Sequence, residues 1–115
     1  MSDCLFCRIV AGEIPANVVK RSDRALAFHD ISPQAPTHVL AIPLEHLDGP
    51  TNLEAAEAEA TAGHLLRFAT QVARELGLAE SGYRLVLNQG VDGGQSVGHV
   101  HFHILGGRRM KWPPG

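Results

Sequence analysis

The chain has 115 residues, of which 44% are hydrophobic and 19% are charged, a composition typical of one folded domain. Its formal net charge of −2 excludes the strongly basic balance by which proteins bind nucleic-acid polymers. No stretch approaches the roughly 18 apolar residues that span a bilayer, and the N-terminus lacks a signal-peptide pattern, so we expect a cytoplasmic protein with no membrane partner.

The first half of the chain predicts one short helix and three strands. Residues 4–12 place apolar side chains at helical spacing, and Gly12 ends the helix. Residues 31–36 contain two prolines and are expected to form a loop. The runs that predict strands are residues 17–21, 24–30 and 37–43, with Ser22-Asp23 as the turn between the first two.

The longest predicted element is a helix over residues 52–77. Thr51 followed by Glu54 fits a capping box at its start, and Gly77 supplies a stop at its end. The apolar stripe of this helix is formed by Leu65, Ala69, Val72 and Leu76.

The last third of the chain predicts two strands, residues 83–89 and 99–105, separated by a glycine-rich loop over residues 90–98. The tail, residues 106–115, contains two prolines and cannot stay regular for long. The order of the elements predicts a single α+β domain over residues 1–115. We expect a five-stranded antiparallel sheet with the long helix on one face and a short N-terminal helix.

Three histidines alternate along the final predicted strand. Side chains alternate between the faces of a strand, so His99, His101 and His103 are expected to share one face, about 7 Å apart in succession. The apolar residues between them, Val100, Phe102 and Ile104, would face the helix. Three imidazoles in this pattern indicate a functional site rather than scattered surface histidines.

Two kinds of chemistry compete for this cluster. Alternating histidines can hold Zn²⁺ or another transition metal, although three neighbours on one face rarely all reach one ion. Alternatively, a neutral imidazole with one bare nitrogen is a nucleophile near neutral pH, and the middle residue, His101, is the natural candidate. The preceding loop favours the second interpretation, because its glycines let backbone N–H groups approach an anion and Ser96 adds a hydroxyl. Phosphoryl chemistry is then predicted.

The sequence resembles the histidine-triad superfamily, and within it the Hint branch of nucleotide-binding proteins. Residues 99–105 match its signature, in which three histidines alternate with apolar residues. The resemblance extends from Phe6 to the last residue, through residues 28–38, Asn88, residues 93–96, residues 105–107 and residues 112–115.

This resemblance implies an enzyme that hydrolyses purine nucleoside 5′-phosphoramidates, or compounds like aminoacyl-adenylates, at the P–N bond. His101 would attack the α-phosphorus and form a nucleotidyl-histidine intermediate, which water then hydrolyses. No cofactor is required for such catalysis. A purine nucleotide of the AMP or GMP type is the expected ligand, and a homodimer with joined sheets is the expected assembly.

The resemblance also implies a role for each residue of the site. Asp30 would accept hydrogen bonds from the ribose hydroxyls, while His38 and His99 would orient the nucleophile and move protons. The slot around the base would be formed by Phe6, Ile9, Ile14, Phe28 and Ile31. The phosphate would be contacted by Asn88, Gly94, Gln95, Ser96 and His103, with Ser96 also near the leaving group. His29 points the other way from Asp30 on a strand and is left out of the site.

Several of these residues also have plainer interpretations. Ile9, Ile14 and Phe28 are equally suited to the core, and Asp30, placed before a loop, can serve as a turn residue that binds its own backbone.

The cysteine pair leaves two interpretations open. Cys4 and Cys7, together with His46 and His99, match the positions of a zinc site that some bacterial histidine-triad proteins carry. The alternative is that both cysteines are small buried residues of the short helix. Two cysteines are too few for a disulfide framework.

Two features bear on the expected dimer. Leu66 and Phe68 flank the helix stripe and are candidates for a second apolar surface, and Trp112 in the tail would reach the partner subunit's site in the resembled proteins. Two other classes of function remain open: a nucleotide-binding adaptor or regulator, and a metal-dependent enzyme or sensor that uses the histidines as ligands.

Overall fold

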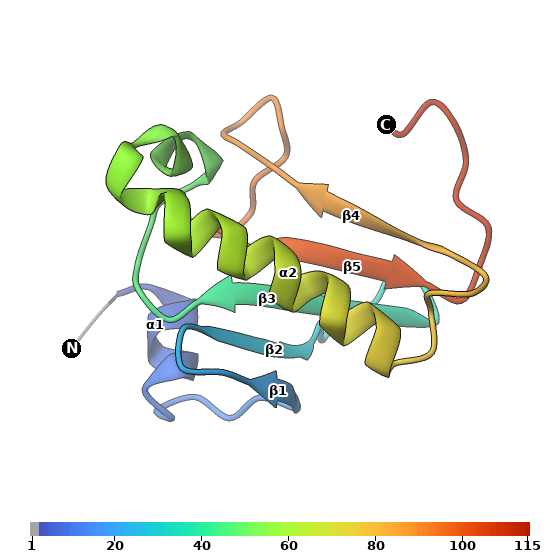
Figure 1. Cartoon of the computed structure of the whole chain (residues 1–115), viewed down its shortest axis with the longest axis horizontal. Coiled ribbons are helices and arrows are strands. Elements are labelled where there is room, and N and C mark those ends of the chain that lie inside the picture. The colour runs from blue at the N-terminus through green and yellow to red at the C-terminus, as the bar shows by residue number, and fades with distance from the viewer. Residues whose placement is uncertain (1–2) are drawn as a thin grey trace.

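The computed structural model describes residues 3–115 and contains one five-stranded sheet. Every neighbouring pair of strands is antiparallel, and the strand order is β1-β2-β3-β5-β4 (Figure 1). The strands are β1 (Val18–Arg21), β2 (Ala25–His29), β3 (Thr37–Pro43), β4 (Tyr83–Leu87) and β5 (Phe102–Gly106). The helices are α1 (Leu5–Val10) and α2 (Glu59–Glu75), the latter preceded by two 3₁₀ turns at Pro50–Glu54 and Ala56–Ala58. The predicted α+β architecture is therefore confirmed.

The long helix α2 packs on one face of the sheet and α1 on the other. Side chains alternate along β2 and β3, so Ala25, Ala27, Val39 and Ala41 pack with α2, whereas Leu26, Phe28, Leu40 and Ile42 pack around Phe6 of α1. The small alanines on the first face let α2 lie close to the sheet. The sheet thus has two apolar faces, one for the main core and one beside α1.

The long helix begins later than predicted. Two 3₁₀ turns, Pro50–Glu54 and Ala56–Ala58, precede it instead. The hydrogen bonds at this point involve Asn52 and Gln89 rather than the predicted capping box of Thr51 and Glu54. Asn52 Oδ1 accepts from the backbone N–H of Gly49 at 3.0 Å, and the Thr51 N–H donates to Gln89 Oε1 at 2.8 Å. Asn52, not Glu54, thus caps the start of this segment, and the Asn52 N–H donates to the carbonyl of Gly49 within the first 3₁₀ turn.

Phe68 was expected on a second surface, and that prediction is wrong. Its side chain is only 1% exposed and belongs to the core between α2 and the sheet, whereas Leu66 is 48% exposed. Leu65, Phe68, Ala69 and Val72 are spaced i, i+3, i+4 and i+7, so Phe68 lies within the buried stripe rather than beside it.

The final strand is shorter than predicted and begins at Phe102, not at His99. Its last pairing with β3 is Ala41 with Phe102, and continuing the register would bring Val100 opposite Pro43. Proline has no N–H to donate to a ladder, so the pairing ends there. The N–H of Val100 donates instead to the carbonyl of Leu47 at 2.7 Å.

The alternation of the histidine segment survives this change. Val100 and Ile104 are buried in the core beneath α2, while the rings of His99 and His101 both contact Phe6 on the opposite face. Within residues 3–115, no helix has the length and apolar character needed to cross a membrane.

Candidate active site

A cavity of about 500 Å³ opens on the sheet face that carries α1. Its volume lies within the range typical of small-molecule sites. The predicted site residues in its wall are Phe6, Ile9, Ile14, Phe28, Asp30, Ile31, Ser96, His101 and His103. The wall therefore combines apolar side chains from α1 and β2 with imidazoles, a carboxylate and a hydroxyl.

Three residues predicted to contact a phosphate are placed differently. Of the described residues, Asn88, Gly94 and Gln95 are not among those that line the cavity. The amide of Gln95 holds the glycine-rich loop together: Nε2 donates to the carbonyls of Asp48 and Val97 at 2.7 and 3.0 Å, and Oε1 accepts from the Gly90 N–H at 2.9 Å. Its side chain thereby supports the segment that carries Ser96.

The cavity also has wall residues that the sequence analysis missed. His29, which was left out of the site, lines it together with Asn17, Leu40 and Val97. His29 is exposed at the end of β2, where the chain turns into the loop. Asn17 is a polar residue between two apolar ones, which was the only signal the sequence offered for it.

His101 is held in one orientation at the floor of the cavity. Its side chain is 3% exposed, and Nδ1 lies 2.8 Å from the carbonyl oxygen of His99. A carbonyl only accepts, so Nδ1 carries the proton and Nε2 is the bare nitrogen of the neutral ring. The ring contacts Phe6 and His103, with centroids 5.2 and 4.9 Å away. His99 therefore orients His101 through its backbone oxygen, not its imidazole.

His38 and His103 form an imidazole pair beside His101. His38 Nε2 lies 2.9 Å from His103 Nδ1, and His38 Nδ1 accepts from the backbone N–H of Gln34 at 3.0 Å. Burial lowers the pKa of His38, although the charge of Asp30 opposes this. Burial, assisted by the charges of His101 and His38, lowers the pKa of His103 to about 4. Both rings are therefore neutral at pH 7.

Asp30 lines the cavity and lies next to His38. Oδ1 accepts from the N–H of Ser32 at 2.8 Å, which is the turn-forming bond of the plainer interpretation. Oδ2 lies 3.5 Å from His38 Nε2. A carboxylate has lone pairs for about four hydrogen bonds, so the turn leaves capacity for a ligand's hydroxyl groups.

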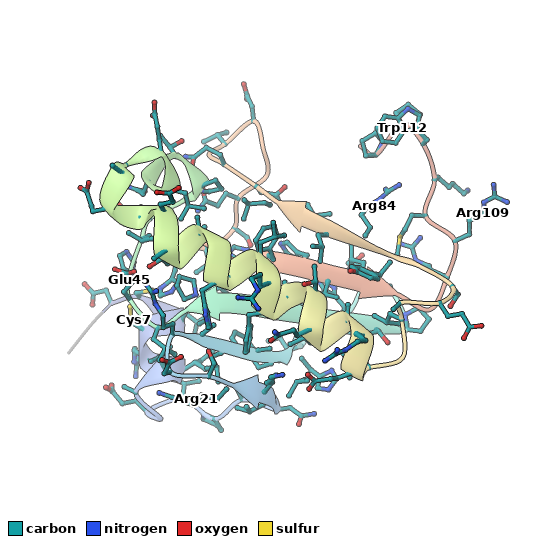
Figure 2. All side chains as sticks on the ribbon, viewed as in Figure 1. Cys7, Arg21, Glu45, Arg84, Arg109 and Trp112 are labelled. Carbon is teal, nitrogen blue, oxygen red and sulfur yellow. The ribbon has the colours of Figure 1, made fainter. Side chains whose placement is uncertain are left out.

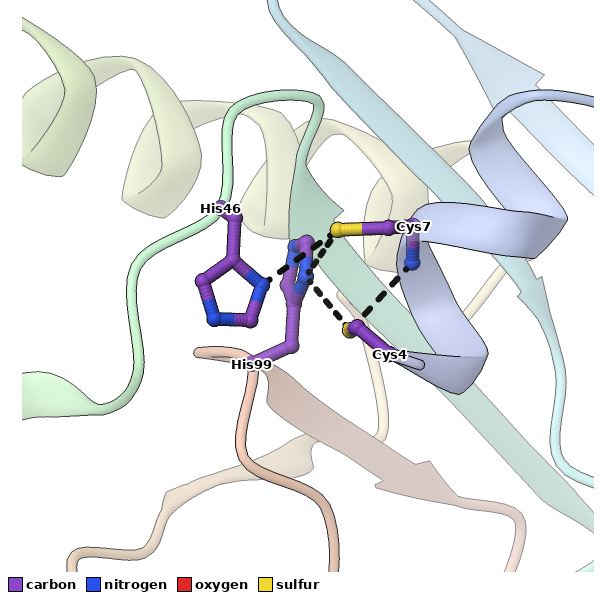
Figure 3. A group of neighbouring side chains, drawn as sticks. All are labelled: Cys4, Cys7, His46 and His99. Carbon is purple, nitrogen blue, oxygen red and sulfur yellow. Dashed lines mark hydrogen bonds between the residues drawn. The ribbon is translucent and has the colours of Figure 1, made fainter. Parts of the chain in front are cut away.

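Cys4, Cys7, His46 and His99 form a compact cluster next to the cavity (Figure 3). Their Sγ and Nδ1 atoms all lie within 4.8 Å of one another. The Sγ atom of Cys4 lies 3.4 Å from Nδ1 of His99, and the Sγ atom of Cys7 lies 3.3 Å from Nδ1 of His46 and 3.5 Å from Nδ1 of His99. Tetrahedral zinc with ordinary bond lengths separates sulfur from nitrogen by about 3.5 Å. The donor set therefore fits Zn²⁺.

The other ring nitrogens of this cluster have the partners that metal-binding histidines usually have. His99 Nε2 donates to the carbonyl of Pro43 at 3.0 Å, and His46 Nε2 donates to Asp48 Oδ1 at 2.7 Å. Both bonds direct a bare Nδ1 toward the cysteines. Burial lowers the pKa of His99, which favours the neutral form that binds metals. Cys7 and Cys4 also flank Phe6, so the cluster ties α1 to the histidine segment.

The C-terminal tail lies far from this site. Trp112 is 82% exposed, and Figure 2 shows it outside the free edge of β4, on the opposite side of the molecule from Cys7. Arg84 Nη2 donates to the carbonyl of Lys111 at 2.9 Å and fixes the tail against β4. The tail therefore makes no wall for the cavity of its own chain.

Comparison with known proteins defines the class. Residues 11–110 match the HIT domain, and this chain belongs to the HIT family. It is 51% identical to a 14 kDa zinc-binding protein of Zea mays over 99% of this chain and 89% of that one. It is 49% identical to the adenylylsulfatase HINT1 of Arabidopsis thaliana over 99% of this chain and 78% of that one. The structure of a HIT family hydrolase from Legionella pneumophila matches with a TM-score of 0.94 and 49% identity, over 98% of this chain and 100% of that chain.

Proposed function

We propose that this protein hydrolyses purine nucleoside 5′-phosphoramidates to release the nucleoside monophosphate. The observation that carries the proposal is the bond from His101 Nδ1 to the carbonyl of His99, which leaves Nε2 bare in the cavity. An imidazole fixed in this way is a nucleophile at neutral pH without loss of a proton. The names of a related hydrolase and of a related adenylylsulfatase also support a hydrolytic reaction on an adenylyl group.

The reaction would run in two displacements at phosphorus. The lone pair of His101 Nε2 forms a bond to the α-phosphorus, and the P–N bond to the amine breaks with its electron pair going to the amine. That nitrogen takes up a proton from solvent, because an amide anion is too basic to leave, and the water that attacks in the second displacement returns one proton to solvent. Water then attacks the phosphorus, the bond to His101 breaks, and the nucleotide departs with the imidazole neutral again.

The wall of the cavity offers groups suited to each part of such a substrate. Phe6 and Phe28 are in edge-to-face contact, with centroids 5.4 Å apart, and present an apolar slot for a purine. Asp30 would accept hydrogen bonds from the adjacent ribose hydroxyls. His103 and Ser96 also line the cavity and would contact the phosphoryl oxygens and the leaving group.

The proposed active form is a homodimer. β4 is an edge strand of the sheet, so its outer backbone groups are available to pair with a second copy. Trp112 is exposed and is not part of the wall of its own cavity, and we expect it to reach the partner's site instead. There it would help select the leaving group.

We also propose that Cys4, Cys7, His46 and His99 bind one structural Zn²⁺. When bound, the ion would hold α1 against the histidine segment, and it would supply no chemistry to the displacement. The fitting sulfur–nitrogen distances and the zinc-binding name of the maize relative support this assignment.

A turnover assay tests the proposed reaction against its alternatives. Adenosine 5′-phosphoramidate and adenylyl sulfate are supplied separately, and AMP release is measured before and after brief chelation, with circular dichroism to verify the fold. We expect turnover of the phosphoramidate that persists after chelation. Binding of AMP without any turnover would favour an adaptor, and activity restored only by added metal would favour a metal-dependent enzyme. Either result contradicts the proposal.

A further inference from the structure

The loop between β2 and β3 ends in an unusual contact with the imidazole pair. The backbone N–H of Gln34 donates to Nδ1 of His38 at 3.0 Å, across four residues of the chain. The side chain of His38 is buried, and its Nε2 faces His103 Nδ1 at 2.9 Å. A peptide N–H thus stands at the start of a chain of hydrogen bonds that ends in the cavity.

A backbone N–H can only donate, and this fixes each proton that follows. His38 Nδ1 must be bare, so the proton of the neutral ring is on Nε2. That N–H points at His103 Nδ1, which must also be bare, so the proton of His103 is on its own Nε2. His103 lines the cavity, and Nε2 is the ring nitrogen that remains for a ligand.

We infer that the backbone amide of Gln34 is a positioning group that sets the tautomers of His38 and His103, so that His103 donates an Nε2–H to a phosphoryl oxygen as an uncharged ring. This inference rests on the proposed function for the identity of the acceptor. The tautomers themselves are a property of the protein without ligand.

The same geometry opposes protonation of either ring. A proton added at His38 Nδ1 would meet the Gln34 N–H, and one added at His103 Nδ1 would meet the His38 N–H. Burial lowers the pKa of both histidines in agreement with this arrangement. Two other titratable groups lie beside this pair of histidines. Asp30 Oδ2 is 3.5 Å from His38 Nε2, and the ring of His101 contacts the ring of His103.

Arg108 holds the residue that supplies this amide. Its Nε and Nη2 both donate to the carbonyl of Gln34, each at 3.1 Å, and tie the loop to the segment after β5. Gln34 Nε2 in turn donates to the carbonyl of Ser32 at 3.0 Å. Arg108 is therefore a second positioning residue, although it lies outside the cavity wall. Its neighbour Arg109 is exposed and provides a matched control.

The tautomers are measured directly by NMR on ¹⁵N-histidine-labelled protein without ligand, since the ring nitrogen shifts distinguish protonated from bare nitrogens. We expect both His38 and His103 to be Nε2–H tautomers at pH 7. A proton on Nδ1 of either ring in the unmodified protein would overturn the inference. The NMR measurement uses no substrate. It can therefore refute the inferred tautomers whether or not the proposed hydrolysis takes place.

Variants then test the origin of the tautomers. Gln34→Pro removes the N–H, whereas Gln34→Ala keeps it and should preserve both NMR signatures. In Gln34→Pro we expect a detectable Nδ1–H population and a kcat loss on the order of a hundredfold for the phosphoramidate, as for loss of one hydrogen bond to a charged group. If Gln34→Pro has the same ring shifts and kcat as Gln34→Ala, the inference is wrong.

Arg108→Ala provides the test if Gln34→Pro does not fold. We expect it to lower kcat about tenfold, the free energy of one net hydrogen bond, and to broaden or shift the His38 Nδ1 signal. Arg109→Ala should leave both readouts unchanged. If Arg108→Ala and Arg109→Ala give the same ring shifts and turnover, the proposed role of the loop is refuted.

Discussion

Acid should destabilise this protein through His103 in particular. Its folded-state pKa is about 4 against an ordinary value of 6.5, because the neutral ring is buried next to His101 and His38. Between these values the unfolded chain binds a proton that the folded chain does not, so stability falls as the pH falls through this window. From pH 7 to pH 4.5 the linkage amounts to roughly 2 kcal/mol.

The assay is urea unfolding of chelated protein at pH 7 and at pH 4.5, for the unmodified chain and for His103→Gln. The glutamine carbonyl can still accept from His38, so the variant removes the titration more than the packing. We expect the variant to lose roughly 2 kcal/mol less than the unmodified chain over this interval. His29→Gln, which removes an exposed imidazole, should keep the original difference. An equal loss in His103→Gln and the unmodified chain would refute the reasoning.

Three further predictions concern the ligand, the metal and the assembly. Asp30→Ala should weaken AMP by roughly 1.5–3 kcal/mol but barely affect its 2′,3′-dideoxy counterpart, and equal losses by calorimetry would make Asp30 purely structural. Metal analysis of untagged protein should find up to one Zn²⁺ per chain, absent when Cys4 and Cys7 are Ser; stable, active protein with no zinc would place both cysteines in the core. Light scattering should give a dimer, and truncation before Lys111, which removes Trp112, should change selectivity among amines more than AMP affinity. A monomer at micromolar concentration or an unchanged selectivity profile would contradict this.

The sheet, its helices and the histidine face could be predicted because each depends on periodicity. Alternation along residues 99–105 places the imidazoles opposite Val100 and Ile104, and this relation holds even though the strand itself begins at Phe102. The strand start depends on Pro43 of a different strand. Such a constraint lies outside the local sequence and could not be predicted from it.

The polar connections of the site were harder to predict, because they use backbone groups or residue types with two possible roles. Gln95 has an amide suited to a phosphate, but in the structure its Nε2 donates to the carbonyls of Asp48 and Val97 and its Oε1 accepts from the Gly90 N–H. His38 was expected to orient the nucleophile, whereas it contacts His103. Its partner at Nδ1 is the peptide N–H of Gln34, which is invisible in a pattern of side chains.

The central claim is that His101 becomes covalently bonded to phosphorus during turnover. His101→Ala should nearly abolish kcat while nucleotide affinity changes by less than about tenfold, because a nucleophile acts mainly on the chemical step. Retention of more than a few per cent of kcat in a clean preparation would remove His101 from this role.

The most direct measurement is mass spectrometry of protein mixed rapidly with adenosine 5′-phosphoramidate and quenched in alkaline denaturant, which preserves a phosphorus–imidazole bond. Trypsin cleavage after Arg84 and Arg108 isolates the three histidines in one peptide. The account predicts one adenylyl group on this peptide, located at His101 by fragmentation and absent from His101→Ala. An adenylyl group on His99 or His103, or AMP release with no labelled peptide at any time point, would contradict it.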